Sequence, residues 1–467
     1  MKKIIKEILK YSVILVIMVI MLLTIMLITI ITIPREKIEE NIKESIPTLK
    51  SVIEVKRIKP ERHDTYLHVY ADEILLNMIY CMDTDTPLKS MMEAKYYERE
   101  ITPGLEGAVE NQSSGNTEYI RYWHGSMAII RPLLVFFNID QIYYIFAIIL
   151  AILLIILFAI FIKKKYYILL LAMIIGLIMT SSIYVPFCLE YVWTYIIMLS
   201  VTIVAIYMEN KESKKNTNIN KNINTNTNIN TNININILMF ITGIITCFFD
   251  FLSTETITFL VPIICIETIR YKENRIKESK KEIKQIAIWI CLWLIGYGMM
   301  WAVKWLLASI ILNINALDYV TEKAMIRING NTNEENIIGK ITNGLTKNFL
   351  TLYPLCQIKS PTTWAIIIIS IFIIIVTLSK RDKEEIKKAC IMLILGTIPY
   401  IRYIVLASHS TTHRFFTFRA QIATIIAVIV ALYIIIDKNR LKKEKVFFGR
   451  KYSDRRKRAN NTNPSVE

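Results

Sequence analysis

The sequence predicts an all-α polytopic membrane protein with about ten transmembrane helices. Hydrophobic residues make up 54% of the 467 positions. They gather in unbroken runs of about 20 residues, the length that an α-helix needs to cross a bilayer. Lys-rich patches separate these runs. This pattern excludes a soluble enzyme, a secreted disulfide scaffold and a disordered chain.

The first apolar run covers residues 11–33 and follows a short Lys-containing start. It is longer than the apolar core of a cleaved signal peptide, so we expect a retained anchor helix. Segment 236–270 has room for two spans near the minimum length or for one longer span, and we expect two. After the first run, and including these two, nine spans are expected, at 141–162, 166–185, 190–208, 236–252, 256–270, 286–312, 363–379, 389–407 and 415–436.

The basic residues predict that both termini are cytoplasmic. With that orientation, the short inside segments and the two termini hold 34 of the 56 Lys and Arg residues, as the positive-inside rule requires. We therefore expect a protein of the cell membrane. Its predicted parts are an N-terminus with an anchor helix (1–33), an external loop with interfacial helices (34–140), three spans (141–208), a disordered Asn-rich cytoplasmic linker (209–236), six spans with an external loop at 313–362 (237–436) and a basic cytoplasmic tail (437–467).

Several chemistries have no support in the sequence. The net charge of +17 would suit nucleic acid, but anionic inner-leaflet lipids explain a basic tail beside the last span, so we expect membrane lipids and no nucleic acid as partners. The seven cysteines form no CxxC pair, and we expect no metal site. Nucleotide-binding glycine motifs are also missing, which argues against ATP-driven transport.

A candidate general base lies in the first external loop. From Asp72 onward the segment reads as an amphipathic helix at the membrane surface. A carboxylate held there is partly desolvated, which raises its pKa toward that of a proton acceptor. Asp72, Glu73 and Asp83 are the alternatives for this role. Each is also a plausible solvated or helix-capping acid.

Three further segments place polar residues near the expected outer surface. Arg121, His124 and Arg131 share one face if their segment is helical, and paired guanidinium donors suit a phosphate. The alternative is that they anchor a helix end. Asp250 and Glu255 lie at the top of the 236–270 hairpin. His413, Arg414 and Arg419 lie at the start of the last span and are candidate anion ligands. Lys304 and Arg402 are charged residues within or near apolar runs, where a charge is a candidate functional group.

The order of these parts resembles the GT-C superfamily of integral-membrane glycosyltransferases. The segment Tyr70-Ala-Asp72-Glu73 is similar to the superfamily's acidic motif in the first external loop. The pair Arg131-Pro132 is similar to the proline-containing segment that leads into the second span. The segment Arg414–Arg419 is similar to the basic residues that the superfamily has near the lipid phosphate. Asp250 and Glu255 would replace the acids of its second external loop, because the 185–190 turn offers only Glu190. A closer resemblance is to uncharacterised polytopic proteins of low-GC Gram-positive bacteria.

This resemblance implies transfer of a sugar from a polyprenyl-phosphate donor to a cell-envelope glycan or protein at the outer membrane face. Asp72 or Glu73 would be catalytic, and the Arg and His residues would bind the substrate phosphate. The lipid-linked sugar is a co-substrate, and we expect no metal or other cofactor. The alternative function is a transporter or flippase for an envelope precursor; a polysaccharide polymerase and a structural membrane protein are further rivals.

Overall fold

The computed structural model describes residues 2–50, 56–57, 66–67, 70–99, 102–219, 228–276, 278–329, 336–358, 360 and 382–436. The described chain is almost entirely helical. Two short antiparallel strand pairs interrupt it, β1 (Lys56–Arg57) with β2 (Tyr66–Leu67) and β3 (Glu98–Arg99) with β4 (Thr102–Pro103). The predicted all-α class is confirmed.

Six helical stretches in the described residues are long and apolar enough to cross a membrane, so the chain is a helical membrane protein. They lie in α1 (Lys2–Thr32), α7 (Ile139–Lys163), α9 (Leu189–Ile219), α12 (Ser279–Leu312), α16 (Lys383–Val405) and the continuous stretch of α18 (Arg414–Thr417), η5 (Phe418–Gln421) and α19 (Ile422–Ile435).

The shorter apolar helices fall on other predicted spans. Helix α8 (Tyr167–Met179) begins the predicted span 166–185, and η3 (Ser182–Phe187) follows it. The segment 236–270 forms two helices, α10 (Asn228–Phe249) and α11 (Ile257–Lys272), joined by the turn at 250–256. The predicted span 363–379 and the tail 437–467 lie outside the described residues, as do residues 220–227 of the predicted linker. The count of ten spans therefore stays a prediction.

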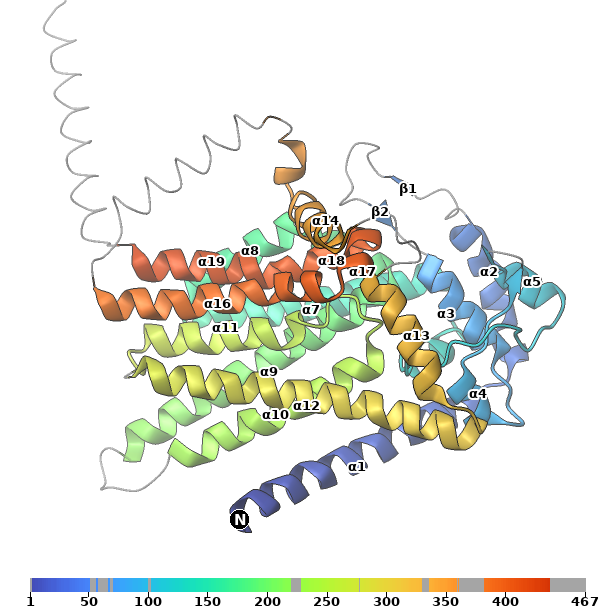
Figure 1. Cartoon of the computed structure of the whole chain (residues 1–467), viewed down its shortest axis with the longest axis horizontal. Coiled ribbons are helices and arrows are strands. Elements are labelled where there is room, and N and C mark those ends of the chain that lie inside the picture. The colour runs from blue at the N-terminus through green and yellow to red at the C-terminus, as the bar shows by residue number, and fades with distance from the viewer. Residues whose placement is uncertain are drawn as a thin grey trace, which may run out of the picture.

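The long helices run side by side, and the shorter ones gather at one end of the bundle (Figure 1). We call this end the loop end. It holds η1 (Arg35–Lys37), α2 (Glu39–Lys50), α3 (Tyr70–Cys81), α4 (Pro87–Glu93), α5 (Leu105–Glu110), α6 (Met127–Leu133), α13 (Ala316–Asn329), α14 (Ile337–Phe349), η4 (Leu355–Gln357) and α17 (Ala407–Thr412).

Two glycines let α10 and α12 pack with their backbones in contact. A Cβ at Gly243 would lie 2.2 Å from the carbonyl oxygen of Trp293, and one at Gly296 would lie 2.2 Å from that of Phe240. Small residues at such positions allow membrane helices to approach closely. Larger side chains would force this pair apart.

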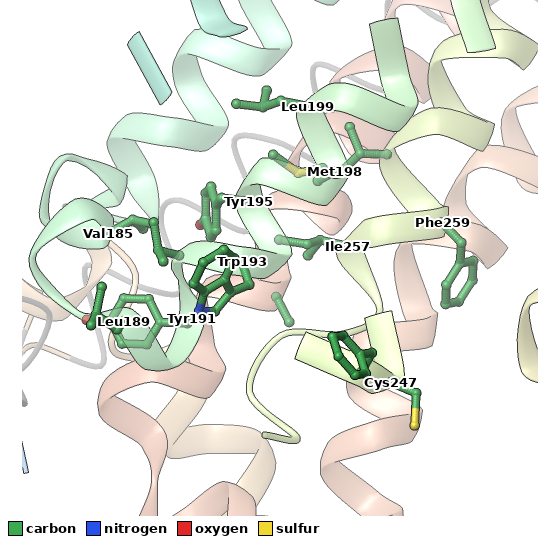
Figure 2. Packing of buried hydrophobic residues seen from close by; sticks show 14 of the residues in the cluster. Val185, Leu189, Tyr191, Trp193, Tyr195, Met198, Leu199, Cys247, Ile257 and Phe259 are labelled. Carbon is green, nitrogen blue, oxygen red and sulfur yellow. The ribbon is translucent and has the colours of Figure 1, made fainter. Parts of the chain in front are cut away.

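Aromatic residues of α9 fill the interior beside this pair. Figure 2 shows Trp193 and Tyr195 of α9 near Ile257 of α11, with Tyr191 beside Leu189 at the start of α9. The Trp193 ring also stacks on Phe249 at the end of α10, with ring centroids 4.9 Å apart. These contacts fix α9, whose first residues reach the loop end.

A buried ion-pair network joins the helices at the end of α11 remote from the 250–256 turn. Arg270 donates to both carboxylate oxygens of Glu209, at 2.9 and 3.1 Å, and also contacts Glu267 and Glu282. The network connects α9, α11 and α12. Buried charges are retained when they are paired in this way.

Candidate functional site

The loop end contains a cavity of about 480 Å³. Seven separate parts of the chain form its wall. They are α3, the 117–121 segment, the start of α9, α13, the 409–413 segment, Tyr96, and Phe251 from the 250–256 turn. Its lining mixes acids, cations, histidines and tyrosines: Asp72, Glu118, Glu190, Arg121, Lys323, His409, His413, Tyr70, Tyr96, Tyr119 and Tyr319. A ligand with both charged and hydroxyl groups fits this composition.

Asp72 lies in the cavity wall and is fully buried. The backbone N–H of Leu189 donates to both of its carboxylate oxygens, at 2.9 and 3.0 Å, and the Tyr143 hydroxyl donates to Oδ2 at 2.7 Å. Burial raises the pKa of Asp72 to about 7, although these hydrogen bonds lower it. Asp72 therefore ties α3 to α7 and to the first residue of α9.

Glu73 and Asp83, the alternatives to Asp72, lie outside the cavity lining. Glu73 accepts a 3.4 Å hydrogen bond from the N–H of Leu105, and burial raises its pKa to about 7. Asp83 accepts hydrogen bonds from the Thr86 hydroxyl at 2.7 Å and the Asp85 N–H at 2.9 Å. These bonds hold the pKa of Asp83 below its usual range and stabilise a turn.

Glu190 lines the cavity beside Asp72. It is half-buried and is the second residue of α9, directly after the residue that donates to Asp72. In the sequence, Glu190 is the single acid of the short 185–190 turn, which is a weak indication of a site. Only the fold brings α3 and the start of α9 together, so no local pattern reveals this carboxylate pair.

Arg121 lines the cavity with its guanidinium between aromatic rings. It donates to the Tyr119 hydroxyl at 2.8 Å, and its guanidinium carbon lies 4.3 Å from the Tyr119 ring centroid and 5.2 Å from that of Tyr122. Its Nε is buried without a hydrogen-bond partner among the described residues. The neighbouring tyrosines hold the pKa of Arg121 above its usual range despite desolvation, so it stays a cation that is available to an anion.

His124 is close in sequence to Arg121 but does not line the cavity. Its φ is +55°, and its Nε2 lies 3.0 Å from the Tyr119 carbonyl oxygen. Burial lowers the pKa of His124 to about 3, with Lys304 and Arg121 adding to the effect. The imidazole is neutral. The next residue must be Gly125, because a Cβ there would lie 2.2 Å from the Phe248 ring.

Arg131 is fully buried in α6 and also lies outside the cavity lining. It donates to the carbonyl oxygen of Ile33 at 2.9 Å and to that of Ile79. Desolvation lowers the pKa of Arg131 to about 10, so the guanidinium remains charged near neutral pH. Its contacts join the end of α1 to α3, and they give it a structural role.

The segment 407–421 brings one predicted residue, His413, into the cavity wall together with His409. The two rings lie 4.6 Å apart. Asn348 of α14 holds the segment: its amide donates to the Ser410 carbonyl oxygen at 2.8 Å and its Oδ1 accepts from the Thr417 hydroxyl at 2.7 Å.

Arg414 and Arg419 lie outside the cavity lining. Arg414 is half-buried, whereas Arg419 is fully buried. The Arg419 guanidinium donates to the Phe415 carbonyl oxygen at 2.6 Å, and its carbon lies 4.9 Å from the Tyr191 ring centroid. Arg419 therefore packs the start of the last span against α9.

Asp250 and Glu255 are buried in the turn between α10 and α11, beside the cavity rather than in it. Asp250 accepts from the Leu252 N–H at 2.7 Å and from the Ser253 hydroxyl at 2.7 Å. Glu255 accepts from the Arg402 Nε at 2.6 Å. These bonds shape the turn that presents Phe251 to the cavity.

The two cations that the sequence places in or near apolar runs are both buried at the loop end. Arg402 of α16 pairs with Glu255, and its guanidinium also donates to the Leu252 carbonyl oxygen. Lys304 of α12 donates to the carbonyl oxygens of Met92 at 3.1 Å and Met91 at 3.4 Å, at the end of α4. Neither lines the cavity. Both connect helices to loop-end segments.

The cavity therefore combines three kinds of group. Asp72, Glu118 and Glu190 supply carboxylates. Arg121 and Lys323 supply cations, and His409 and His413 supply imidazoles. The described residues contain no group of three or more His, Cys, Asp or Glu side chains arranged to hold a metal ion. Such an arrangement can accept a proton at one point and stabilise an anion at another.

Comparisons of the chain with family models, with curated proteins and with solved structures found no match.

Proposed function

We propose that the chain is a membrane glycosyltransferase that moves a sugar from a polyprenyl-phosphate donor to a hydroxyl group of a cell-envelope glycan or protein. The cavity at the loop end is its proposed active site. The observation that supports this proposal most is that carboxylates and an aromatic-packed arginine from distant parts of the chain line one cavity. The proposal places the loop end at the outer face of the cell membrane.

The reaction needs a proton acceptor for the attacking hydroxyl. The acceptor oxygen would bond to the anomeric carbon, and its proton would pass to a carboxylate. We assign this role to Glu190, because it is half-buried and lines the cavity. Asp72 is fully buried and both its oxygens already accept hydrogen bonds, so we assign it to positioning the first turn of α9 and Glu190 with it.

The reaction also needs a cation for the leaving group. When the bond from the anomeric carbon to the phosphate oxygen breaks, the electron pair stays on that oxygen, which a fixed cation stabilises. Arg121 suits this role because its tyrosine neighbours orient the guanidinium and its Nε has no partner among the described residues. Lys323 brings a second cation to the lining from α13.

Binding of the donor tests the proposal before any acceptor is known. We would measure binding of a polyprenyl-phosphate hexose to the purified full chain in lipid nanodiscs, against a phospholipid of equal charge. We expect selective binding that weakens by about tenfold or more in Arg121→Ala, since a bidentate charged contact is lost. Lys89→Ala is the matched control, because Lys89 is an exposed cation of α4 that does not line the cavity.

Two outcomes would contradict the proposal. Equal binding of donor and phospholipid by the wild type would remove the donor site and favour the transporter alternative. Equal weakening in the Arg121 and Lys89 variants would show that surface charge alone attracts the donor.

A further inference from the structure

Helix α13 is attached directly to the end of a membrane-spanning helix. α12 ends at Leu312, where Asn313 adopts a φ of +54°, and the N–H of Ala316 donates to the Ser309 hydroxyl at 3.2 Å. The first turn of α13 therefore lies beside the last turn of α12. Figure 1 shows α13 crossing the loop end at a steep angle to α12.

One face of α13 belongs to the cavity. Tyr319, Lys323 and Ile326 line it, spaced four and three residues apart, so they lie on one side of the helix. The Tyr319 hydroxyl also donates to the Glu118 carbonyl oxygen at 3.3 Å. This face is occupied by the cavity and its wall.

The opposite face of α13 is apolar and exposed. Leu317, Met325 and Ile328 are 56%, 51% and 40% exposed. Their spacing of eight and three residues is that of a single helical face. Three large apolar side chains on one exposed face predict a partner that covers them.

The lipid bilayer is the partner that continuity of the surface indicates. Leu306 and Ile310 of α12 are exposed on a helix that spans the membrane, so lipid covers them. Further along the chain, the apolar side chains of Ile314 and Leu317 are exposed as well. The side of α13 between its two faces carries the exposed acids Asp318 and Glu322, which suits a helix with one edge in water.

We propose that α13 lies in the lipid–water interface, with Leu317, Met325 and Ile328 inserted among the lipid headgroups and acyl ends. Its other face forms the cavity wall. Helix α13 then separates the cavity from the bilayer. This inference uses burial and helix geometry alone, so it does not depend on the proposed reaction.

Photo-crosslinking from single positions tests the proposal. Met325 is replaced by p-benzoylphenylalanine in the full chain, which is reconstituted into vesicles of a phospholipid with an alkyne-tagged acyl chain. Leu306 is the positive control and Glu322 the matched control on the polar edge of the same helix. We expect lipid labelling from Met325 close to that from Leu306 and about fivefold or more above that from Glu322.

Labelling from Met325 as low as from Glu322 would overturn the proposal. A crosslinked dimer in place of labelled lipid would overturn it in favour of a second copy of the chain. The same substitution at Ile328 provides a second measurement on the same face if the Met325 variant does not fold.

Discussion

The backbone N–H of Leu189 donates to both carboxylate oxygens of Asp72, at 2.9 and 3.0 Å. This contact joins α3 of the first long loop to the first residue of α9. A carboxylate at a helix N-terminus is stabilised by the unpaired N–H groups and by the helix dipole. Because Glu190 follows Leu189, the same contact fixes the place of Glu190 in the cavity wall.

The two carboxylates should differ in their effect on sugar transfer. Glu190→Gln removes the proposed proton acceptor, and we expect a loss of about 10²-fold or more. Asp72→Asn keeps the shape of the side chain and one acceptor oxygen, so we expect a smaller loss, about tenfold. The measurement is transfer of labelled sugar from a polyprenyl-phosphate donor, with Asp83→Asn as the control outside the cavity. Full activity of Glu190→Gln with an inactive Asp72→Asn would instead make Asp72 the base.

The stability of the protein should depend on the protonation of Asp72. Its pKa in the folded chain is raised from 3.8 to about 7 by burial. The folded state therefore binds a proton more tightly than the unfolded state does. The contribution of Asp72 to stability is full below pH 3.8 and is lost as pH rises through about 7.

We expect the thermal midpoint of the wild type to fall more between pH 5.5 and pH 8 than that of Asp72→Asn, which lacks the titrating group. Glu73, whose pKa is also raised to about 7, contributes equally to both proteins in this comparison. The same pH dependence in both would show that Asp72 does not carry the effect.

Gly243→Ala should destabilise the contact between α10 and α12. Its Cβ would lie 2.2 Å from the Trp293 carbonyl oxygen, so the helices must separate. We expect a loss of about 1–3 kcal/mol, typical of overpacking, measured as thermal unfolding in detergent. Gly298→Ala on α12 is the matched control, because no atom lies within 4 Å of its added Cβ. Equal midpoints for the two variants would refute the close contact.

The buried pair of Arg402 and Glu255 should show strong coupling. Both side chains are less than a tenth exposed, and their atoms lie 2.6 Å apart. Removing one partner leaves a buried charge, so we expect Glu255→Gln to lower stability by about 3–5 kcal/mol. Replacing Arg402 as well, by Met, should restore part of that loss. A double variant that is as unstable as the sum of both single variants would indicate no coupling.

The position of an arginine in the sequence did not reveal what it contacts. The sequence suggests that Arg121 and Arg131 bind one phosphate together. In the structure Arg121 lines the cavity, whereas Arg131 donates to the carbonyl oxygens of Ile33 and Ile79. Tyr122 and Trp123 follow Arg121 in the sequence, whereas Ile130 and Pro132 flank Arg131. The Arg121 side chain contacts the nearby Tyr119 and Tyr122. The contacts of Arg131 with α1 and α3 are long-range, so the sequence around it does not reveal them.

The acids illustrate the same limit. The amphipathic helix that starts at Asp72 predicts a site at this carboxylate, and Asp72 does lie in the cavity wall. Nothing in the sequence around Glu190 marks it as a cavity residue. Asp250 and Glu255 stand out as two acids at the top of a hairpin, but Asp250 stabilises a buried turn and Glu255 forms an ion pair. A carboxylate in a short turn looks the same in sequence whether it meets a cavity or a cation.

That the chain is a helical membrane protein follows from its sequence alone, because the length and polarity of a spanning helix are local properties of each apolar run. The apolar runs also located the long helices of the bundle, such as α7, α12 and α16, but not most of the short helices of the loop end. Which polar side chains line the cavity together, and which pair with each other, depends on how the helices pack. Those choices depend on contacts such as Leu189 with Asp72 and Asn348 with Ser410, between residues far apart in the chain. No periodic pattern encodes such contacts, since they arise from how the helices pack.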